Sequence, residues 1–518
     1  DINEESVEIA RLSLWLRTAT KGRKLNDLSS NIKCGNSLID DPAVAGDKAF
    51  DWKKEFPSVF AKGGFDVVIG NPPYGALIRK EEQQFYLKRY TTPAYKLDTY
   101  AVFIEAGVEL VKKHGFLCFI VPYTWLTIDQ HRKLREFVLN RNLIEVVNIP
   151  KKVFDDADLD TVIVNLRNQP SSEAFIASEI HEQAVVETGR VLVANVRLNP
   201  DLLINLMLSD RDALLLTKIR KFDALDSSFS VSQGYIPYRR TDLVKEFGEE
   251  AGNKIIDERQ WHSETKHDSE WRQEIQGRDL RRYGHSESFQ YVKYGKHVAG
   301  YVDEKYFTQP RILVMEVTRG DRYKITAAHV EKEYFNTPSI INIIAPADWQ
   351  ELLFALLAVI NSRLITWYHE KAHSKANAVT SIPKILIKDI RNLPVPAPKA
   401  LASLIPIVSK MHEAASELDA TLNAMPGLLQ SKYTLPKLSR NLENWPALDF
   451  KGFLKELHKA KVSLSLAEEA EWLGYFTEQQ AKAHALQAQI NKTDREIDAL
   501  VYALYGLTEE EVRVVEGK

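Results

Sequence analysis

Apolar runs of strand length alternate with helical stretches in the first third of the chain. "FDVVIG" at 65–70 and "GFLCFIVP" at 115–122 are continuous apolar runs, and "DTYAVFIEAGVELVKKHG" at 98–115 has the apolar spacing of a helix. Two further runs, "LIEVVNIP" and "LDTVIVNLR", lie at 143–150 and 159–167. Strands that are apolar on both faces are typical of parallel sheets covered by helices on both sides. We therefore predict a doubly wound α/β domain that ends near residue 170.

The composition limits the classes of protein to which the chain can belong. Its 518 residues, 44% hydrophobic and 27% charged, suit a globular protein of two to four domains. With 68 Lys plus Arg against 71 Asp plus Glu, no basic field covers the whole chain, so nucleic-acid binding would need local patches. Two cysteines make neither a disulfide framework nor a metal cluster, and no apolar run reaches the roughly 18 residues of a membrane span. We expect a cytoplasmic protein without a membrane segment or a bound metal.

The turn Asn71-Pro72-Pro73-Tyr74 directly follows the first of these strands. Ligands of open α/β sheets bind beyond the carboxyl ends of the strands. The two prolines stiffen the turn, so Asn71 and Tyr74 are held with little freedom. Amide and backbone oxygens can accept both N–H groups of an exocyclic amine, and the tyrosine ring can stack on a planar base. A tight turn without a function is the alternative, since Asn-Pro is common in turns.

The turn and its surroundings resemble the NPPY motif of amino methyltransferases that use S-adenosyl-L-methionine. "DINEESVEIARLSLWL", "NIKCGNSLID" and "FDVVIGNPPY" follow one another as in the adenine-N6 DNA methyltransferases of type IIG restriction-modification enzymes. The resemblance implies methyl transfer to an adenine flipped out of double-stranded DNA. It also implies that the Asn71 side chain and the Pro72 carbonyl accept hydrogen bonds from the target amine, with Pro73 completing the turn and Tyr74 stacking on the base.

The same resemblance assigns further residues of the site. Asp1 would hold the ribose hydroxyls of the cofactor, and Asn36 would contact its adenine amine beside Asn71. Phe154, in "KKVFDDADLDTVIVNL", would supply a second aromatic ring against the flipped base. Two alternatives stay open: Asn36 as a residue that caps a turn, and Phe154 as an ordinary buried residue at a strand edge.

The glycine-rich loop that cradles the methionine part of the cofactor in this family has no counterpart in the sequence. We therefore expect residues 1–170 to be the C-terminal portion of a methyltransferase domain and the chain to be part of a longer enzyme. An N-terminal nuclease domain, or restriction or defence partner subunits, would accompany it.

Residues 206–400 interleave basic and aromatic side chains, and a connector is expected at 171–205. "GRDLRRYG", "LLAVINSRLITWYH" and "IRNLPVP" resemble the target-recognition domain of the same enzymes. A solvated charged surface would have the same composition. The candidate DNA contacts are Arg278, Arg281, Arg282, Lys293, Lys296, Arg319 and Arg322.

The last region, 401–518, has apolar residues at helical spacing and is predicted to form a helical pair. Its prolines, Pro426 among them, argue against a long coiled coil.

Three other functions stay open. Protein-glutamine methyltransferases share the NPPY motif, but the long basic and aromatic region favours DNA as the substrate. A non-catalytic recognition module of a larger complex is the second, and the intact NPPY turn argues against it. The third is a phage-defence methyltransferase without a nuclease, since we find no PD…(D/E)xK cleavage motif in the sequence.

Overall fold

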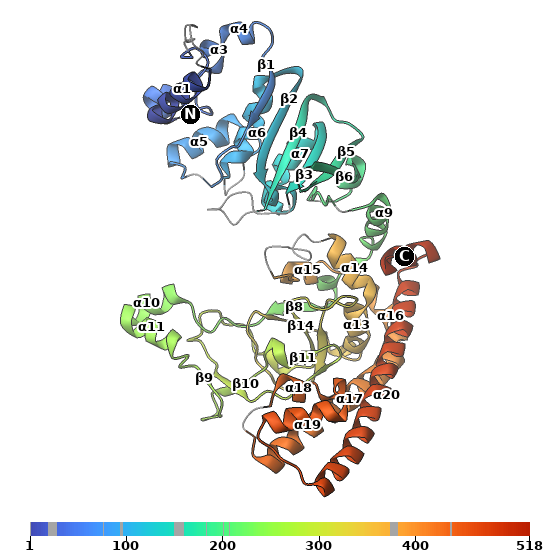
Figure 1. Ribbon diagram of the computed structural model, residues 1–518. Helices are drawn as coiled ribbons and strands as arrows, with labels where there is room; N and C mark the ends of the chain where they lie inside the picture. The colour runs from blue at the N-terminus through green and yellow to red at the C-terminus, as the bar shows by residue number, and fades with distance from the viewer. Residues whose placement is uncertain are drawn as a thin grey trace. The chain divides into compact units, whose positions relative to one another are not determined.

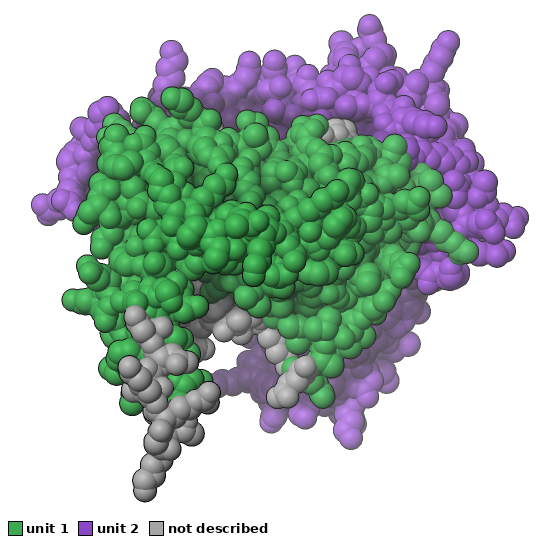
Figure 2. Space-filling model, turned by 90° about the horizontal axis from the view of Figure 1, so that it is seen from above, with its two compact units in different colours: residues 1–214 green, residues 215–518 purple. Residues whose placement is uncertain are grey.

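The computed structural model describes residues 2–18, 28–75, 77–93, 97–149, 160–182, 184–199, 201–206, 208–372, 382–435 and 438–518. The chain divides into two compact units, residues 1–214 and residues 215–518, which Figure 2 shows in different colours. Each unit is described by itself.

Unit 1 is built on a six-stranded sheet with the order β1-β2-β4-β3-β5-β6. β1 and β2 are parallel, whereas β4 runs antiparallel to both of its neighbours, β2 and β3. The α/β class is confirmed, but the sheet is mixed and not parallel throughout. Continuous apolar runs are typical of parallel strands, but an antiparallel strand that is covered on both faces, such as β4, has the same pattern. The strands are β1 (Phe65–Gly70), β2 (Val111–Pro122), β3 (Arg141–Ile149), β4 (Thr161–Pro170), β5 (Ala174–His181) and β6 (Ala184–Leu192).

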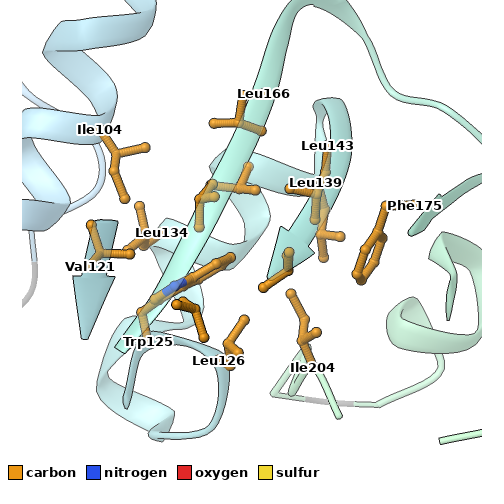
Figure 3. Close-up of a cluster of buried hydrophobic side chains, with 14 of the residues drawn as sticks. Ile104, Val121, Trp125, Leu126, Leu134, Leu139, Leu143, Leu166, Phe175 and Ile204 are labelled. Atoms are coloured by element: carbon orange, nitrogen blue, oxygen red, sulfur yellow. The ribbon is translucent and has the colours of Figure 1, made fainter. Parts of the chain in front are cut away.

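The sheet extends past residue 170, where the sequence predicted the domain to end. β5 and β6 lie within 171–205, the stretch expected to be a connector, and β5 pairs with β3 in parallel. Phe175 of β5 and Ile204 belong to the same buried cluster as Trp125 and Leu143 (Figure 3). The prediction missed these strands because β6 is exposed along most of its length and lacks a continuous apolar run.

Helices cover the sheet and bring the chain back between its strands. α6 (Thr99–Leu110) joins the region after β1 to β2, and α7 (Arg132–Leu139) joins β2 to β3. Gly107 lets α6 approach the sheet, because a Cβ atom there would lie 2.4 Å from a Leu117 methyl carbon. This close packing carries the first residue of α6, Thr99, toward the turn that follows β1.

One edge of this sheet exposes apolar side chains. Among the described strands, β2 is the one neighbour of β1, and Val67 and Ile69 are 53% and 77% exposed. Residues 4–18 form α1 (Glu4–Thr18), in which Val7 is the only buried residue, and Leu12 and Leu16 face solvent.

Unit 2 combines a β-rich part with a helical part (Figure 1). Its four-stranded antiparallel sheet has the order β15-β14-β16-β8, and a smaller sheet has the order β10-β13-β9. α13 (Leu352–Asn361), which is buried along most of its length, packs on the larger sheet. The strands are β8 (Ser230–Gln233), β9 (His262–Ser263), β10 (Trp271–Glu274), β13 (Gln290–Lys293), β14 (Arg311–Met315), β15 (Ala327–Val330) and β16 (Ile340–Ile344).

The helical pair expected after residue 400 is present. α17 (Ile405–Tyr433) and α20 (Leu466–Leu504) run side by side, and Pro426 lies inside α17 instead of ending it. At one end of the pair, α18 (Arg440–Glu443) and α19 (Phe450–Lys459) close a separate core around Trp445, Phe453 and Phe476. The chain finishes with α21 (Glu509–Glu516).

Within the described residues, no single helix has the length and apolar character needed to cross a bilayer; only α13 and α14 (Arg363–Ala372), bent by 58° at their junction, satisfy both criteria when taken together.

Candidate active site

The NPPY turn lies directly after Gly70, the last residue of β1, as the sequence predicted. Pro72 is buried and Tyr74 is partly buried, whereas Asn71 and Pro73 are exposed. Pro72 and Tyr74 therefore pack against the rest of the unit, and the Asn71 side chain faces solvent.

Two hydrogen bonds fix the second half of the turn. The Thr99 hydroxyl, which is 5% exposed, donates to the Pro73 carbonyl over 2.6 Å. The Tyr74 hydroxyl donates to the Ile120 carbonyl of β2 over 2.9 Å. Among the hydrogen bonds between described residues, none ends on the Pro72 carbonyl or on the Asn71 side chain. Within the part of the chain that the structure describes, the two acceptors that the resemblance assigns to the target amine therefore have no partner, whereas the neighbouring Pro73 carbonyl has one.

Tyr74 is held in a single orientation. Its ring meets the ring of Tyr100 edge to face, with centroids 6.3 Å apart and an interplanar angle of 87°. Burial raises the pKa of Tyr74 to about 12, so the phenol is neutral at physiological pH and acts as a hydrogen-bond donor.

A polar cluster lies behind Tyr100. The Tyr100 hydroxyl and His131 Nε2 are 2.9 Å apart, and the same nitrogen lies 3.3 Å from the Asp98 carboxylate. Gln130 donates a second hydrogen bond to that carboxylate over 3.3 Å. These contacts position the start of α6, from which Thr99 reaches the turn.

A pocket of about 860 Å³ connects the turn to Asn36. This volume is in the range of pockets that hold a cofactor-sized molecule. Its walls also include Trp52, Tyr86 and Phe103, so the cavity is largely apolar with a few polar groups.

Asn36 caps a turn and lines the pocket at the same time. Its side-chain oxygen accepts a hydrogen bond from the Leu38 backbone N–H over 3.1 Å, which is the capping role left open by the sequence. Burial raises the pKa of Tyr86 to about 12, and a hydrogen bond from the Asn36 side chain opposes that rise. A contact from Asn36 to a bound cofactor therefore stays a prediction.

Asp1 and Phe154, the other residues assigned by resemblance, lie outside the described residues. Thr99 was not among the predicted site residues. The only signal in the sequence was its place near the start of the helix predicted at 98–115.

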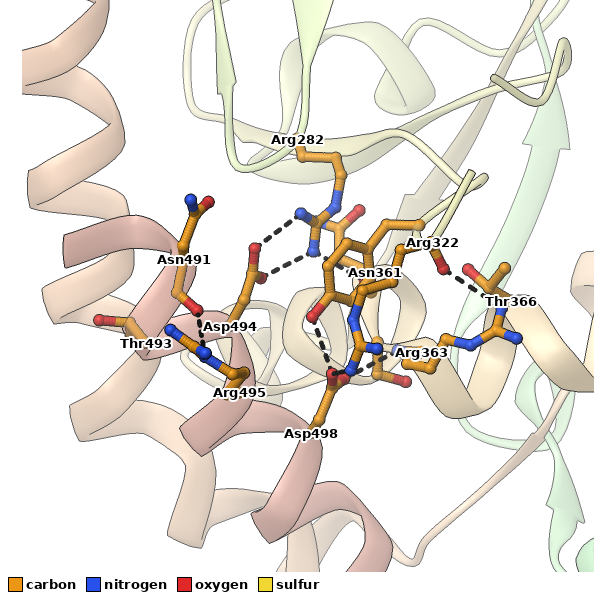
Figure 4. Close-up of polar contacts among 12 residues, drawn as sticks. Arg282, Arg322, Asn361, Arg363, Thr366, Asn491, Thr493, Asp494, Arg495 and Asp498 are labelled. Atoms are coloured by element: carbon orange, nitrogen blue, oxygen red, sulfur yellow. Dashed lines mark hydrogen bonds and ion pairs between the residues drawn. The ribbon is translucent and has the colours of Figure 1, made fainter. Parts of the chain in front are cut away.

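Three of the predicted DNA contacts in unit 2 form ion pairs with the C-terminal helices, and Figure 4 shows the pair of Arg282 and Asp494. Arg282 makes two hydrogen bonds of 2.8 and 2.9 Å to Asp494 of α20. Arg322 binds Glu516 of α21 over 2.6 Å. Arg281 pairs with Asp419 of α17. These arginines join the β-rich part to the helices, and a contact from any of them to DNA stays a prediction. Composition alone does not distinguish an internally paired arginine from one that faces a ligand.

Two of the other four candidates have an acidic residue of the β-rich part as neighbour. Lys293 is 3.1 Å from Glu270, and the Arg278 side chain, 69% exposed, lies 3.9 Å from Asp279. Lys296 and Arg319 are exposed, and no ion pair joins either side chain to another described residue.

Each unit contains a range that matches a known protein family. Residues 1–154 match the Eco57I restriction-modification methylase, and residues 272–395 match the TaqI-like C-terminal specificity domain. The two matches follow one another along the chain, the methylase first and the specificity domain second. Residues 398–501, which include α17 to α20, match a domain of unknown function, DUF8810.

Parts of the chain are similar to larger type II enzymes. It is 25% identical over 393 residues to a Methanocaldococcus jannaschii protein provisionally named a type II restriction enzyme and methyltransferase, which covers 73% of this chain and 31% of the relative. It is 30% identical over 167 residues to the type II restriction enzyme and methyltransferase RM.Eco57I of Escherichia coli, which covers 30% and 16%. The chain thus spans less than a third of the length of these relatives.

A solved structure of the type IIL restriction-modification enzyme MmeI in complex with DNA has a similar fold. The similarity covers 100% of this chain and 64% of the MmeI chain, with a TM-score of 0.52 and 14% identity. At this level of identity the likeness concerns the fold alone.

Proposed function

We propose that this chain is the methylase and recognition part of a site-specific DNA adenine-N6 methyltransferase in a restriction-modification or phage-defence system. The observation that carries the proposal is the pair of unoccupied acceptors, the Asn71 amide oxygen and the Pro72 carbonyl, at the carboxyl end of β1. Both acceptors lie in the range that matches the Eco57I restriction-modification methylase, which supports the proposal. The match to a TaqI-like specificity domain favours DNA over a protein amide as the substrate.

The two acceptors determine how the target amine is oriented. An amine that donates one N–H to Asn71 and the other to Pro72 has its nitrogen lone pair drawn out of conjugation with the ring. The lone pair is then available for attack without a strong base. The bond from Thr99 to Pro73 supports this geometry by keeping the turn in place.

The substrate base has to leave the DNA stack to reach this turn. Extrusion costs a few kcal/mol. Stacking on one aromatic side chain returns about 1 to 3 kcal/mol per base, and Tyr74 is oriented by its bond to Ile120 for that contact.

The pocket beside the turn fits S-adenosyl-L-methionine in volume and in its mixture of apolar walls with polar groups. When bound, this cofactor supplies the methyl group, whose transfer to the amine breaks the methyl–sulfur bond and releases a proton to water. Asn36, Trp52 and Tyr86 would hold it from the pocket walls.

We further propose that additional methyltransferase elements cover the exposed edge of β1 and the apolar side of α1 in the working enzyme. Val67 and Ile69 on that edge are exposed to an extent that is unusual for a strand beside a binding pocket. The chain by itself should then bind the cofactor weakly. Isothermal titration of S-adenosyl-L-methionine into this chain tests the point, since a micromolar Kd would contradict it.

The alternative of a non-catalytic recognition module makes a different prediction. Such a module binds duplex DNA, but no methyl group is transferred even when the upstream residues of the parent protein are present. A protein-glutamine methyltransferase would label protein and leave DNA unlabelled.

A further inference from the structure

The exposed charged and titratable side chains of α19 are lysines and one histidine. Lys451, Lys455 and Lys459 are four residues apart and therefore share one side of the helix, His458 lies between them, and Lys461 follows the helix. All five side chains are exposed. The opposite face of the helix packs into the core around Trp445 and Phe476. We refer to Lys451, Lys455, Lys459 and Lys461 as the lysine row.

The acidic residues of this segment are used inside the fold. Glu456 is buried and accepts hydrogen bonds from Ser439 (2.8 Å), Asn441 (3.1 Å) and Lys459 (2.6 Å). The contact with Lys459, together with these amide and hydroxyl donors, lowers the pKa of Glu456 to about 2. Asp449 caps the helix by accepting from the Gly452 N–H over 2.7 Å.

The remaining lysines of the row keep their full charge toward solvent. Among the described residues, Lys459 is the one member of the row that forms an ion pair, and its partner is Glu456. Elsewhere on the helical part, three exposed lysines have an acidic partner within 4.0 Å, as in Lys482 with Glu417 at 2.9 Å. A surface that separates the two charges in this way differs from an ordinary solvated helix face.

The row is held in a fixed place relative to the specificity domain. α19 packs through Phe453 onto Trp472 of α20, with ring centroids 5.9 Å apart. α20 is joined in turn to the β-rich part of unit 2 through Asp494 and Arg282 (Figure 4). A ligand bound by the row would therefore be held in register with the specificity domain.

We propose that the lysine row binds the phosphate backbone of duplex DNA beside the recognised sequence. Successive lysines on one helix face lie about 6 Å apart along the axis, a spacing suited to a linear polyanion. Lysine is a point charge that binds phosphate without the planar geometry of arginine, so the contact would carry no sequence information. This inference rests on the proposed function, and it gives a role to a helix within the DUF8810 match.

The test compares two triple variants of the full chain. Lys451→Gln, Lys455→Gln and Lys461→Gln neutralise the row, and Lys459 is left in place because it supports Glu456. Lys410→Gln, Lys482→Gln and Lys492→Gln remove the same charge from exposed positions on α17 and α20 and form the control. Circular dichroism and thermal unfolding check that both variants fold, and Lys455→Gln alone gives a milder change if the triple variant does not.

The probe is a fluorescent duplex, titrated between low and high salt. Each phosphate contact contributes about 0.9 to the slope of log K against log salt, so neutralising the row should lower the slope by about 2 to 3, and Lys455→Gln by about 1. The loss should be equal for duplexes of any sequence, and the control should keep the slope of the unmodified chain. A slope for the row variant equal to that of the control overturns the role of the row while the proposed function stands. Failure of the unmodified chain to bind any duplex overturns both.

Discussion

The Thr99 hydroxyl donates a hydrogen bond of 2.6 Å to the Pro73 carbonyl, and this contact makes the two proline carbonyls of the turn chemically different. Pro73 has its partner inside the fold. Pro72 keeps its carbonyl for a ligand, beside the Asn71 side chain. A helix that begins at Thr99 thereby determines which oxygen atoms of the turn are available to a substrate.

Replacing Thr99 by Val should lower kcat for methyl transfer and leave KM for DNA nearly unchanged. Loss of the bond to Pro73 frees the turn to move, and a displacement of about 1 Å at a reacting centre costs roughly a hundredfold in rate. Steady-state kinetics of the enzyme with its upstream residues would measure the effect. Thr99→Ser keeps the hydroxyl and should recover most of the rate; a serine variant as slow as the valine variant would show that the hydrogen bond is not the cause.

Replacing Arg282 by Met should destabilise unit 2 without a specific effect on DNA binding. The substitution leaves the Asp494 carboxylate, whose side chain is 5% exposed, without its two hydrogen bonds from arginine. Breaking a buried ion pair on one side costs about 3 kcal/mol or more, which urea unfolding can measure.

The double variant Arg282→Met with Asp494→Leu serves as the control for that experiment. It removes both charges and should regain much of the lost free energy of unfolding. An unchanged stability in Arg282→Met, together with a smaller salt dependence of DNA binding, would instead favour a direct contact between Arg282 and DNA.

Acid should weaken the core beneath the lysine row through Glu456. Its pKa is about 2 in the folded protein and near the usual 4.5 in the unfolded chain, so the unfolded state binds a proton first as the pH falls. The stabilisation is complete above about pH 5 and is lost as the pH falls from the unfolded value toward the folded one. Thermal unfolding at pH 7 and pH 3 should show a smaller difference in Tm for Glu456→Gln than for the unmodified chain. An equal difference in both proteins would assign the acid sensitivity to other carboxylates.

Local features of this fold were predictable from sequence, and features that depend on distant partners were not. The strand β1 and its turn could be recognised because an apolar run and four consecutive residues define them. The contact between Thr99 and Pro73 joins residues 26 positions apart and depends on how closely α6 packs on β2, which no local pattern records.

The ion pairs of the candidate DNA-binding arginines could not be predicted either, because their partners lie far away in the sequence. Arg282 and Asp494 are 212 positions apart, and Arg322 and Glu516 are 194 apart. An arginine among aromatic residues has the same local pattern whether its partner is a phosphate or a distant carboxylate. The strands β5 and β6 lack the continuous apolar run by which the other strands were found. Polar residues interrupt β5, and β6 is exposed along most of its length.

The central claim is that Asn71 and Pro72 orient an adenine amine for methylation. The most direct test is transfer of labelled methyl groups from S-adenosyl-L-methionine to unmethylated duplex DNA, by the protein with its upstream residues, followed by identification of the labelled base. Asn71→Ala is compared with Asn31→Ala, a change at an exposed asparagine outside the pocket. We predict label on adenine N6 for the unmodified and Asn31→Ala proteins, and none for Asn71→Ala, whose affinity for DNA should be nearly unchanged. Undiminished transfer by Asn71→Ala, or loss of DNA binding equal to its loss of transfer, would contradict the account.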